Sequence, residues 1–170
     1  MISLLFRSLR SIVSIFTAAG SPRQLAFGIA LGAMIGLVPK GNLTAAVLSI
    51  LLLTLRVNLA AGVAAALLFS WLGAWTDPLA HCIGSAILTH SSVQPIGARL
   101  VDLPVVPWTA LNNTVVLGNL VLGLVLFYPV YWLSYVFFER HRDRVAEKLE
   151  KYKVAIVLEK TEPATQWRLR

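Results

Sequence analysis

Apolar residues fill two long tracts of this chain, and charged residues are nearly absent from both. Residues 24–98 contain three charged side chains, Lys40, Arg56 and Asp77, and residues 103–138 contain none. A soluble fold must present a polar surface to water, whereas a bilayer surrounds a helix with hydrocarbon. The pattern therefore predicts an all-α integral membrane protein.

Local signals divide these tracts into helices. Ser21 and Asn42 suit the N-cap position, and Pro22 suits a first helical turn. Because proline lacks the N–H that a helix interior needs, we expect breaks at Pro39 and at Asp77-Pro78. The expected apolar helices cover residues 24–38, 43–55, 59–76, 79–88 and 111–138.

The lengths of these helices leave two arrangements open. Residues 111–138 are long enough to cross ~30 Å of hydrocarbon, which takes about 20 residues. The first two stretches are shorter, so they are either short spans in a locally thinned bilayer or parts of re-entrant hairpins. Residues 23–90 repeat a plan of helix, proline-centred break and helix, which is typical of duplicated broken-helix hairpins. We expect about four transmembrane helices in total, and a proline-containing loop over residues 91–107.

Residues 1–19 are predicted to form an amphipathic helix that lies in the membrane interface. Arg7 and Arg10 share one face at helical spacing, and apolar residues fill the opposite face. A secretory signal peptide is the rival interpretation, because residues 17–20 resemble a cleavage site. The two arginines interrupt the apolar core that a signal peptide needs, which favours the interfacial helix.

Charge sets the expected orientation. Charged residues make up 14% of the chain, against about 25% of a soluble domain. If residues 23–39, 42–56, 58–76 and 111–138 cross, thirteen of the 15 Lys and Arg residues face one side. The positive-inside rule assigns that side, with both termini, to the cytoplasm. Charges that flank apolar spans argue against a nucleic-acid-binding protein, which would gather them on one soluble face.

These patterns predict a membrane domain over residues 1–138 and a charged cytoplasmic tail over residues 139–170. The tail begins with a predicted helix over residues 139–153. We expect its first basic residues to lie at anionic lipid head groups, where each contributes about 1 kcal/mol to membrane binding. The predicted membrane-surface anchors are Arg7, Arg10, Arg140, Arg142 and Arg144.

Small residues recur on two of the predicted helices. Gly28, Gly32 and Gly36 lie at intervals of four, and Gly62 begins a similar series with Ala66. In a bilayer the hydrophobic effect does not drive helices together, because lipid tails are as apolar as the side chains. Small side chains allow helix backbones to approach closely and to associate through van der Waals packing instead. We predict that these glycines serve helix packing; a dimer seam or a lipid-accommodating groove is the alternative.

The predicted candidate polar site consists of Lys40, Asn42, Asp77 and His81, which lie at or beside the two proline breaks. If the breaks meet, Lys40 and Asp77 could form an ion pair where charge is expensive; otherwise both are solvated at the interface. Asp77 and His81 have the i, i+4 spacing of metal ligands but lack a third ligand, so no metal site is predicted. The chain shows no phosphate loop or nucleophile motif, and we expect no cofactor and no catalytic residue.

One segment is similar to a known family. The residues that carry the resemblance are Ser21, Pro22, Gln24, Leu25, Ala26, Gly28, Ala30, Gly32, Gly36, Pro39 and Asn42. They resemble the bacterial family called domain of unknown function 2062, over roughly residues 20–90; Asp77-Pro78 falls where that family often has Asn-Pro. The resemblance implies an uncharacterised multi-pass protein of the bacterial inner membrane and supplies no catalytic residues.

Two functions follow as hypotheses. The first is a non-enzymatic component of envelope or lipid handling that acts in a complex. Its expected partners are the lipid bilayer, anionic phospholipid and another membrane or envelope protein, with no nucleic acid. The second is a small transporter or channel with its site at the two proline breaks. A membrane enzyme would need an acid–base pair, for which only Asp77 and His81 are available.

Overall fold

The computed structural model describes residues 21–161, with side chains described over residues 21–141. Within that range the chain forms six helices and no strand, which confirms the all-α prediction. The helices are α2 Pro22–Leu37, α3 Leu43–Thr54, α4 Leu59–Leu88, α5 Gln94–Val101, α6 Val106–Thr109 and α7 Thr114–Thr161. The predicted interfacial helix over residues 1–19, with Arg7 and Arg10, lies outside the described residues.

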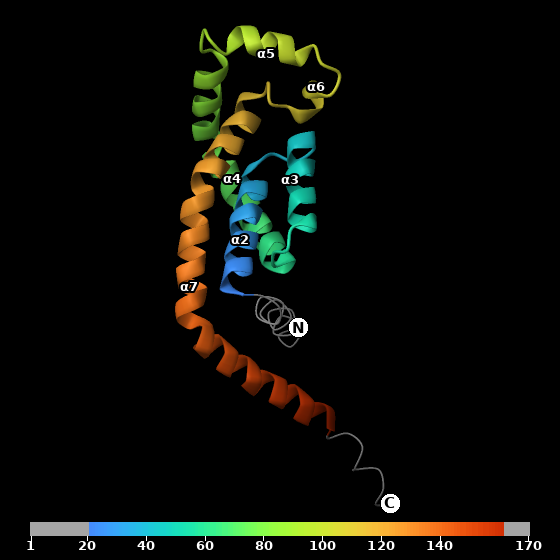
Figure 1. The fold of residues 1–170 in the computed structure, drawn as a ribbon, viewed down its shortest axis with the longest axis vertical. Helices are drawn as coiled ribbons and strands as arrows, with labels where there is room; N and C mark the ends of the chain where they lie inside the picture. Colours follow the sequence, from blue (N-terminus) through green and yellow to red (C-terminus); the bar gives the residue numbers. More distant parts are fainter. Residues whose placement is uncertain (1–20, 162–170) are drawn as a thin grey trace, which may run out of the picture.

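Three helices form the bundle. α2 packs lengthwise against both α4 and α7, and α3 turns back beside α2 (Figure 1). α5 and α6 cross one end of the bundle, and α7 continues past the other end, where it changes direction (Figure 1). The buried core consists of Leu31, Met34, Ile35, Val38, Ala45, Leu48, Leu52 and Val116.

The predicted N-caps are confirmed. Ser21 Oγ accepts a hydrogen bond from the Gln24 backbone N–H at 3.3 Å, and Gln24 Oε1 accepts from the Ser21 N–H at 3.0 Å. This reciprocal pair is a capping box, and Pro22 follows it in the first turn of α2. Asn42 caps α3 in the same way, through a 2.8 Å hydrogen bond from the Ala45 N–H. Asn58, buried at the start of α4, accepts from the Ala61 N–H at 2.9 Å.

The predicted break at Pro39 is present. α2 ends at Leu37, and Gly41 has a φ of 90°, in the left-handed region that glycine adopts without steric cost. That backbone conformation lets the chain reverse and enter α3.

The predicted break at Asp77-Pro78 is wrong, because α4 runs unbroken from Leu59 to Leu88 with Pro78 inside it. Proline removes one backbone hydrogen bond, which usually kinks or ends an isolated helix. Here α4 is buried on both sides of the proline, at Gly73 and at Ala80, against α2 and α7 respectively. Packing on both sides of Pro78 offsets the lost bond, and the second of the two predicted broken-helix hairpins does not form.

The predicted loop over residues 91–107 is also wrong, because this segment contains α5 and α6. Pro95 and Pro107 each lie in the first turn of their helix. A backbone N–H in the first turn has no acceptor within the helix, so proline costs no hydrogen bond there. The helix predicted over residues 139–153 is present as a continuation of α7, which also runs through Pro129. Among the predicted anchors, Arg140 is exposed, whereas the side chains of Arg142 and Arg144 lie outside the described range.

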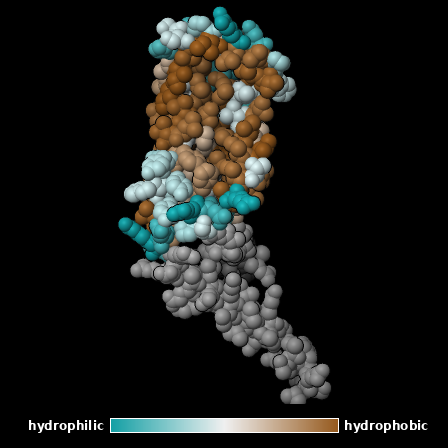
Figure 2. Space-filling model, in the orientation of Figure 1, coloured by the Kyte–Doolittle hydropathy of each residue, from teal (hydrophilic) through white to brown (hydrophobic). Residues whose placement is uncertain are grey.

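The surface of the bundle is strongly apolar. α4 and residues Thr114–His141 of α7 are each long and apolar enough to cross a membrane, while α2 and α3 are apolar but shorter. Large apolar side chains face outward, such as Leu67 at 70% and Trp75 at 74% exposure. Figure 2 shows this hydrophobic surface as a band along the bundle, with hydrophilic groups gathered at its two ends.

Candidate functional site

The contact between α2 and α4 brings backbone against backbone. A Cβ added at Gly28 would lie 2.6 Å from the carbonyl oxygen of Asn58, and one at Gly36 would lie 2.5 Å from Phe69 Cβ. At Gly32 an added Cβ would collide with the carbonyl oxygen of Gly62. The structure therefore places Gly28, Gly32 and Gly36 where only a hydrogen side chain fits, whereas a Cβ at Gly62 would meet the end of the Leu52 side chain of α3. The contact made by the first three fixes α4 on α2.

A second contact of the same kind joins α4 to α7. Here a Cβ at Gly84 would collide with the backbone of Thr114, and a Cβ at Gly118 would collide with the backbone of Ala80. We did not predict this contact from the sequence, although Ala80 and Gly84 recur at helical spacing on α4. Because α4 and α7 touch at backbone distance, polar side chains on their facing sides come within hydrogen-bonding reach.

Two hydrogen bonds cross this second contact. Asn119 Nδ2 donates to Asp77 Oδ1 at 2.9 Å, and His81 Nδ1 lies 2.7 Å from Thr114 Oγ1. We call these four residues the polar seam. Asn119 is 0% exposed, Asp77 and Thr114 are half-buried, and His81 is exposed. The Oδ1 of Asn119 has no hydrogen-bond partner within the described part of the chain.

Lys40 has a different environment. Its Nζ donates to three backbone oxygens at the end of α2, those of Ile35 at 2.6 Å, Gly36 at 3.1 Å and Val38 at 2.8 Å. These carbonyls lie at the negative end of the helix dipole, so a lysine ammonium stabilises them. Partial burial lowers the pKa of Lys40 from its ordinary value, whereas the carbonyl oxygens favour its charged form.

Asn42 is also occupied by the backbone, because its Oδ1 caps α3 and its Nδ2 donates to the Pro39 carbonyl at 2.7 Å. The structure therefore divides the predicted polar site in two. Lys40 and Asn42 secure the α2–α3 turn, while Asp77 and His81 belong to the polar seam. Lys40 and Asp77 do not form the ion pair that we considered, and within residues 21–141 no three His, Cys, Asp or Glu side chains gather into a metal-binding group.

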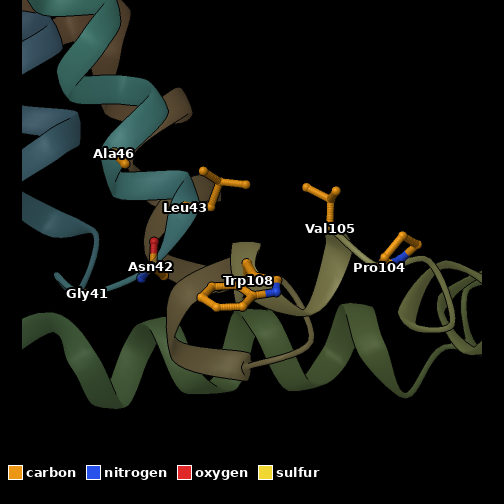
Figure 3. Close-up of a pocket in the computed structure, with 7 residues that line it drawn as sticks. All are labelled: Gly41, Asn42, Leu43, Ala46, Pro104, Val105 and Trp108. Atoms are coloured by element: carbon orange, nitrogen blue, oxygen red, sulfur yellow. The ribbon is translucent and has the colours of Figure 1, made fainter.

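A pocket lies between the start of α3 and the segment that contains α6. It has a volume of about 470 Å³ and is lined by Gly41, Asn42, Leu43, Ala46, Pro104, Val105 and Trp108. Leu43 reaches toward Val105 across the gap, and the ring of Trp108 lies beside Asn42 (Figure 3). A 2.8 Å hydrogen bond from Thr44 Oγ1 to the Thr109 carbonyl joins the two walls. The sequence does not reveal this pocket, because its walls come from segments that are distant along the chain.

The pocket is apolar in all but its Asn42 corner. Val105 is 59% exposed and Trp108 is 74% exposed, so both line the pocket and also face the outside. The pocket is therefore open to the outside of the bundle along these two residues. Such a shape accepts a hydrocarbon chain without burying an unpaired polar group.

Comparison with known proteins identifies a family and a relative. The family model described as "Uncharacterized protein conserved in bacteria (DUF2062)" matches residues 7–147. An uncharacterized protein of Treponema pallidum (strain Nichols) is 27% identical over 130 residues, which cover 76% of this chain and 80% of the relative. No solved structure matches the chain.

Proposed function

Because this chain belongs to the DUF2062 family of bacterial proteins, we propose that it is a multi-pass inner-membrane protein that handles lipid or envelope components without catalysis, within a complex. The observation that carries the proposal is the outward-facing apolar surface of α4 and α7. Leu67, Trp75 and Val125 are each more than half exposed, and each such side chain in water would forfeit about 1.5–3 kcal/mol of burial energy. Hydrocarbon lipid removes that cost.

The proposed topology has four membrane-embedded helices. α4 and α7 cross fully, and α2 and α3 form a short hairpin beside them. At 1.5 Å per residue, α2 measures roughly 24 Å and α3 roughly 18 Å, so the hairpin fits a thinned region of the bilayer. Arg23 and Arg56 lie at the open end of the hairpin, on the side to which α7 exits. The positive-inside rule assigns that side to the cytoplasm.

Aromatic residues support the same placement. Tyr128 and Trp132 lie exposed on the cytoplasmic half of α7, and Trp108 lies exposed in α6, at the opposite end of the bundle (Figure 1). Aromatic side chains near both ends match the aromatic belts at the two faces of a bilayer. α5 and α6 then rest at the outer face.

Lipid is the component that we propose the protein handles. The pocket beside α3 opens onto the membrane-facing surface, and it can hold part of one acyl chain against Leu43, Ala46 and Val105. A lipid bound there keeps its head group near the outer interface, beside the α2–α3 turn. The absence of catalysis is part of the proposal, and it is consistent with the polar seam, whose Asp77 and His81 are each hydrogen-bonded to α7.

The membrane placement is tested by fractionation and by cysteine labelling. We expect the protein in the membrane fraction after alkaline carbonate washing, with release only by detergent. In a variant with Cys82→Ala, a membrane-impermeant maleimide should label Ser92→Cys in intact spheroplasts and label Glu139→Cys only after permeabilisation. Recovery of a monodisperse protein in plain buffer would contradict the membrane assignment, and the reverse labelling pattern would contradict the orientation.

Lipid binding is tested by filling the pocket. Ala46→Phe places a ring in the pocket, whereas Val47→Phe places the same ring on an exposed position of α3 outside the lining. In native mass spectrometry of the purified protein, we expect Ala46→Phe to lose the co-purified lipid and Val47→Phe to keep it. Equal lipid retention in the two variants would rule out this pocket as the lipid site.

A further inference from the structure

The carboxylate of Asp77 lies half-buried in the α4–α7 contact without a counter-charge. Its only described partner is the neutral amide of Asn119. Lys40 directs its ammonium at the carbonyl oxygens of its own turn, and His81 directs Nδ1 at Thr114. A negative charge in a low-dielectric contact is costly unless a positive charge accompanies it. No positively charged side chain among the described residues therefore balances the Asp77 carboxylate.

The same contact lacks one donor to a buried oxygen. Asn119 is fully buried, and its Nδ2 points at Asp77. The Oδ1 of the same amide has no partner among the described atoms. Reversing the amide does not help, because the NH₂ group would then be the unpaired one.

One small cation removes both deficits, and we propose that the polar seam binds a single alkali cation between the Asp77 carboxylate and the Asn119 Oδ1. Carboxylate and amide oxygens are the ligands that hard cations prefer. The seam thus offers oxygen ligands from both helices.

Charge balance selects a monovalent ion. One carboxylate supplies a single negative charge, so a divalent ion would leave an uncompensated positive charge between apolar helices. No group of three His, Cys, Asp or Glu side chains in residues 21–141 would hold a transition metal. A bound proton also neutralises Asp77, and the resulting O–H can donate to the Asn119 Oδ1, so the test below includes a pH control that separates proton binding from cation binding.

The test measures thermal unfolding of the purified full chain in detergent, with NaCl replaced by choline chloride at constant ionic strength. A cation that binds only the folded state raises the melting temperature as the cation concentration increases. The expected rise is roughly 3–6 °C when the Na⁺ concentration is about ten times the dissociation constant. We expect Asp77→Asn and Asn119→Leu each to abolish this rise. The matched control Asp102→Asn, which neutralises an exposed carboxylate at the end of α5, should keep it.

Several results would overturn the proposal: an equal rise with choline, a larger rise with Ca²⁺ than with Na⁺, or loss of the Na⁺ response in Asp102→Asn as well. A rise produced only by lowering the pH would replace the cation with a proton. If either seam variant does not fold, equilibrium dialysis of the unmodified protein with radioactive Na⁺ decides the question. Binding of one Na⁺ ion per chain supports the site, whereas the absence of bound Na⁺ refutes it. These outcomes are independent of membrane placement and of lipid binding, which have their own tests.

Discussion

Adding one methyl group at Gly32 tests the backbone contact on which the bundle rests. In the structure, the Cβ of an alanine at this position would collide with the carbonyl oxygen of Gly62 and would lie 3.0 Å from the Ala65 Cβ. Both neighbours belong to the interior of α4, so neither can rotate away and the two helices must separate. Overpacking of this kind costs roughly 1–3 kcal/mol.

The same substitution also has a favourable term, which needs its own control. Replacing glycine by alanine in a helix interior contributes up to about 1 kcal/mol through helix propensity. Gly73→Ala provides this control, because Gly73 is also buried within a helix but its added Cβ would meet the nearest atom at 3.4 Å, an ordinary contact. The difference between the two variants therefore isolates the clash.

The assay is reversible unfolding of the full chain in mixed detergent micelles, followed by circular dichroism. We expect Gly32→Ala to be less stable than Gly73→Ala by roughly 1–3 kcal/mol, with unchanged helix content before the transition. If the two variants unfold at the same denaturant concentration, α2 and α4 are not in backbone contact. The polar seam, which depends on the placement of α4 in the bundle, would then lose its structural basis.

Three further predictions follow from individual contacts. Lys40→Met removes a charged donor from the carbonyls that end α2 and should lower stability by roughly 1.5–3 kcal/mol; a loss no larger than that of Arg99→Met, an exposed control, would contradict it. Asn42→Ala removes the α3 cap and should cost about 1 kcal/mol in the same unfolding assay, whereas no change would mean that the cap is dispensable. Pro78→Ala should leave the helix content by circular dichroism unchanged, since α4 is already continuous; a gain in helix content would indicate that the proline does break the helix.

The helix starts show how far local signals reach. Ser21 with Gln24, and Asn42 before α3, could be identified in advance because a cap depends on residues three or four positions apart. The same holds for the turn at Gly41, which needs a positive φ. The prolines were harder to interpret: Pro39 lies at a true break, whereas Pro78 lies inside α4. The difference is that Pro78 has buried packing on both sides, which no local pattern reveals.

The candidate site shows the opposite dependence. Asp77 and His81 drew attention as rare polar residues in an apolar tract, but their partners Asn119 and Thr114 lie on a helix far along the chain. Which polar atoms meet depends on how α4 and α7 are aligned, and that alignment is set by the close approach of Gly84 and Gly118 to the opposing backbones. A single sequence carries no measure of that alignment.

The order of apolar and polar residues by itself determined that the chain is helical, where most helices begin, and that residues 111–138 are long and apolar enough to cross a membrane. Hydrophobicity and capping act between near neighbours, so one chain suffices to read them. Only the tertiary structure decided that α4 is continuous, that Lys40 and Asp77 stay apart, and that a fully buried amide oxygen at Asn119 lacks a partner. Those outcomes depend on which backbones come into contact, and contact between distant segments is a property of the folded chain.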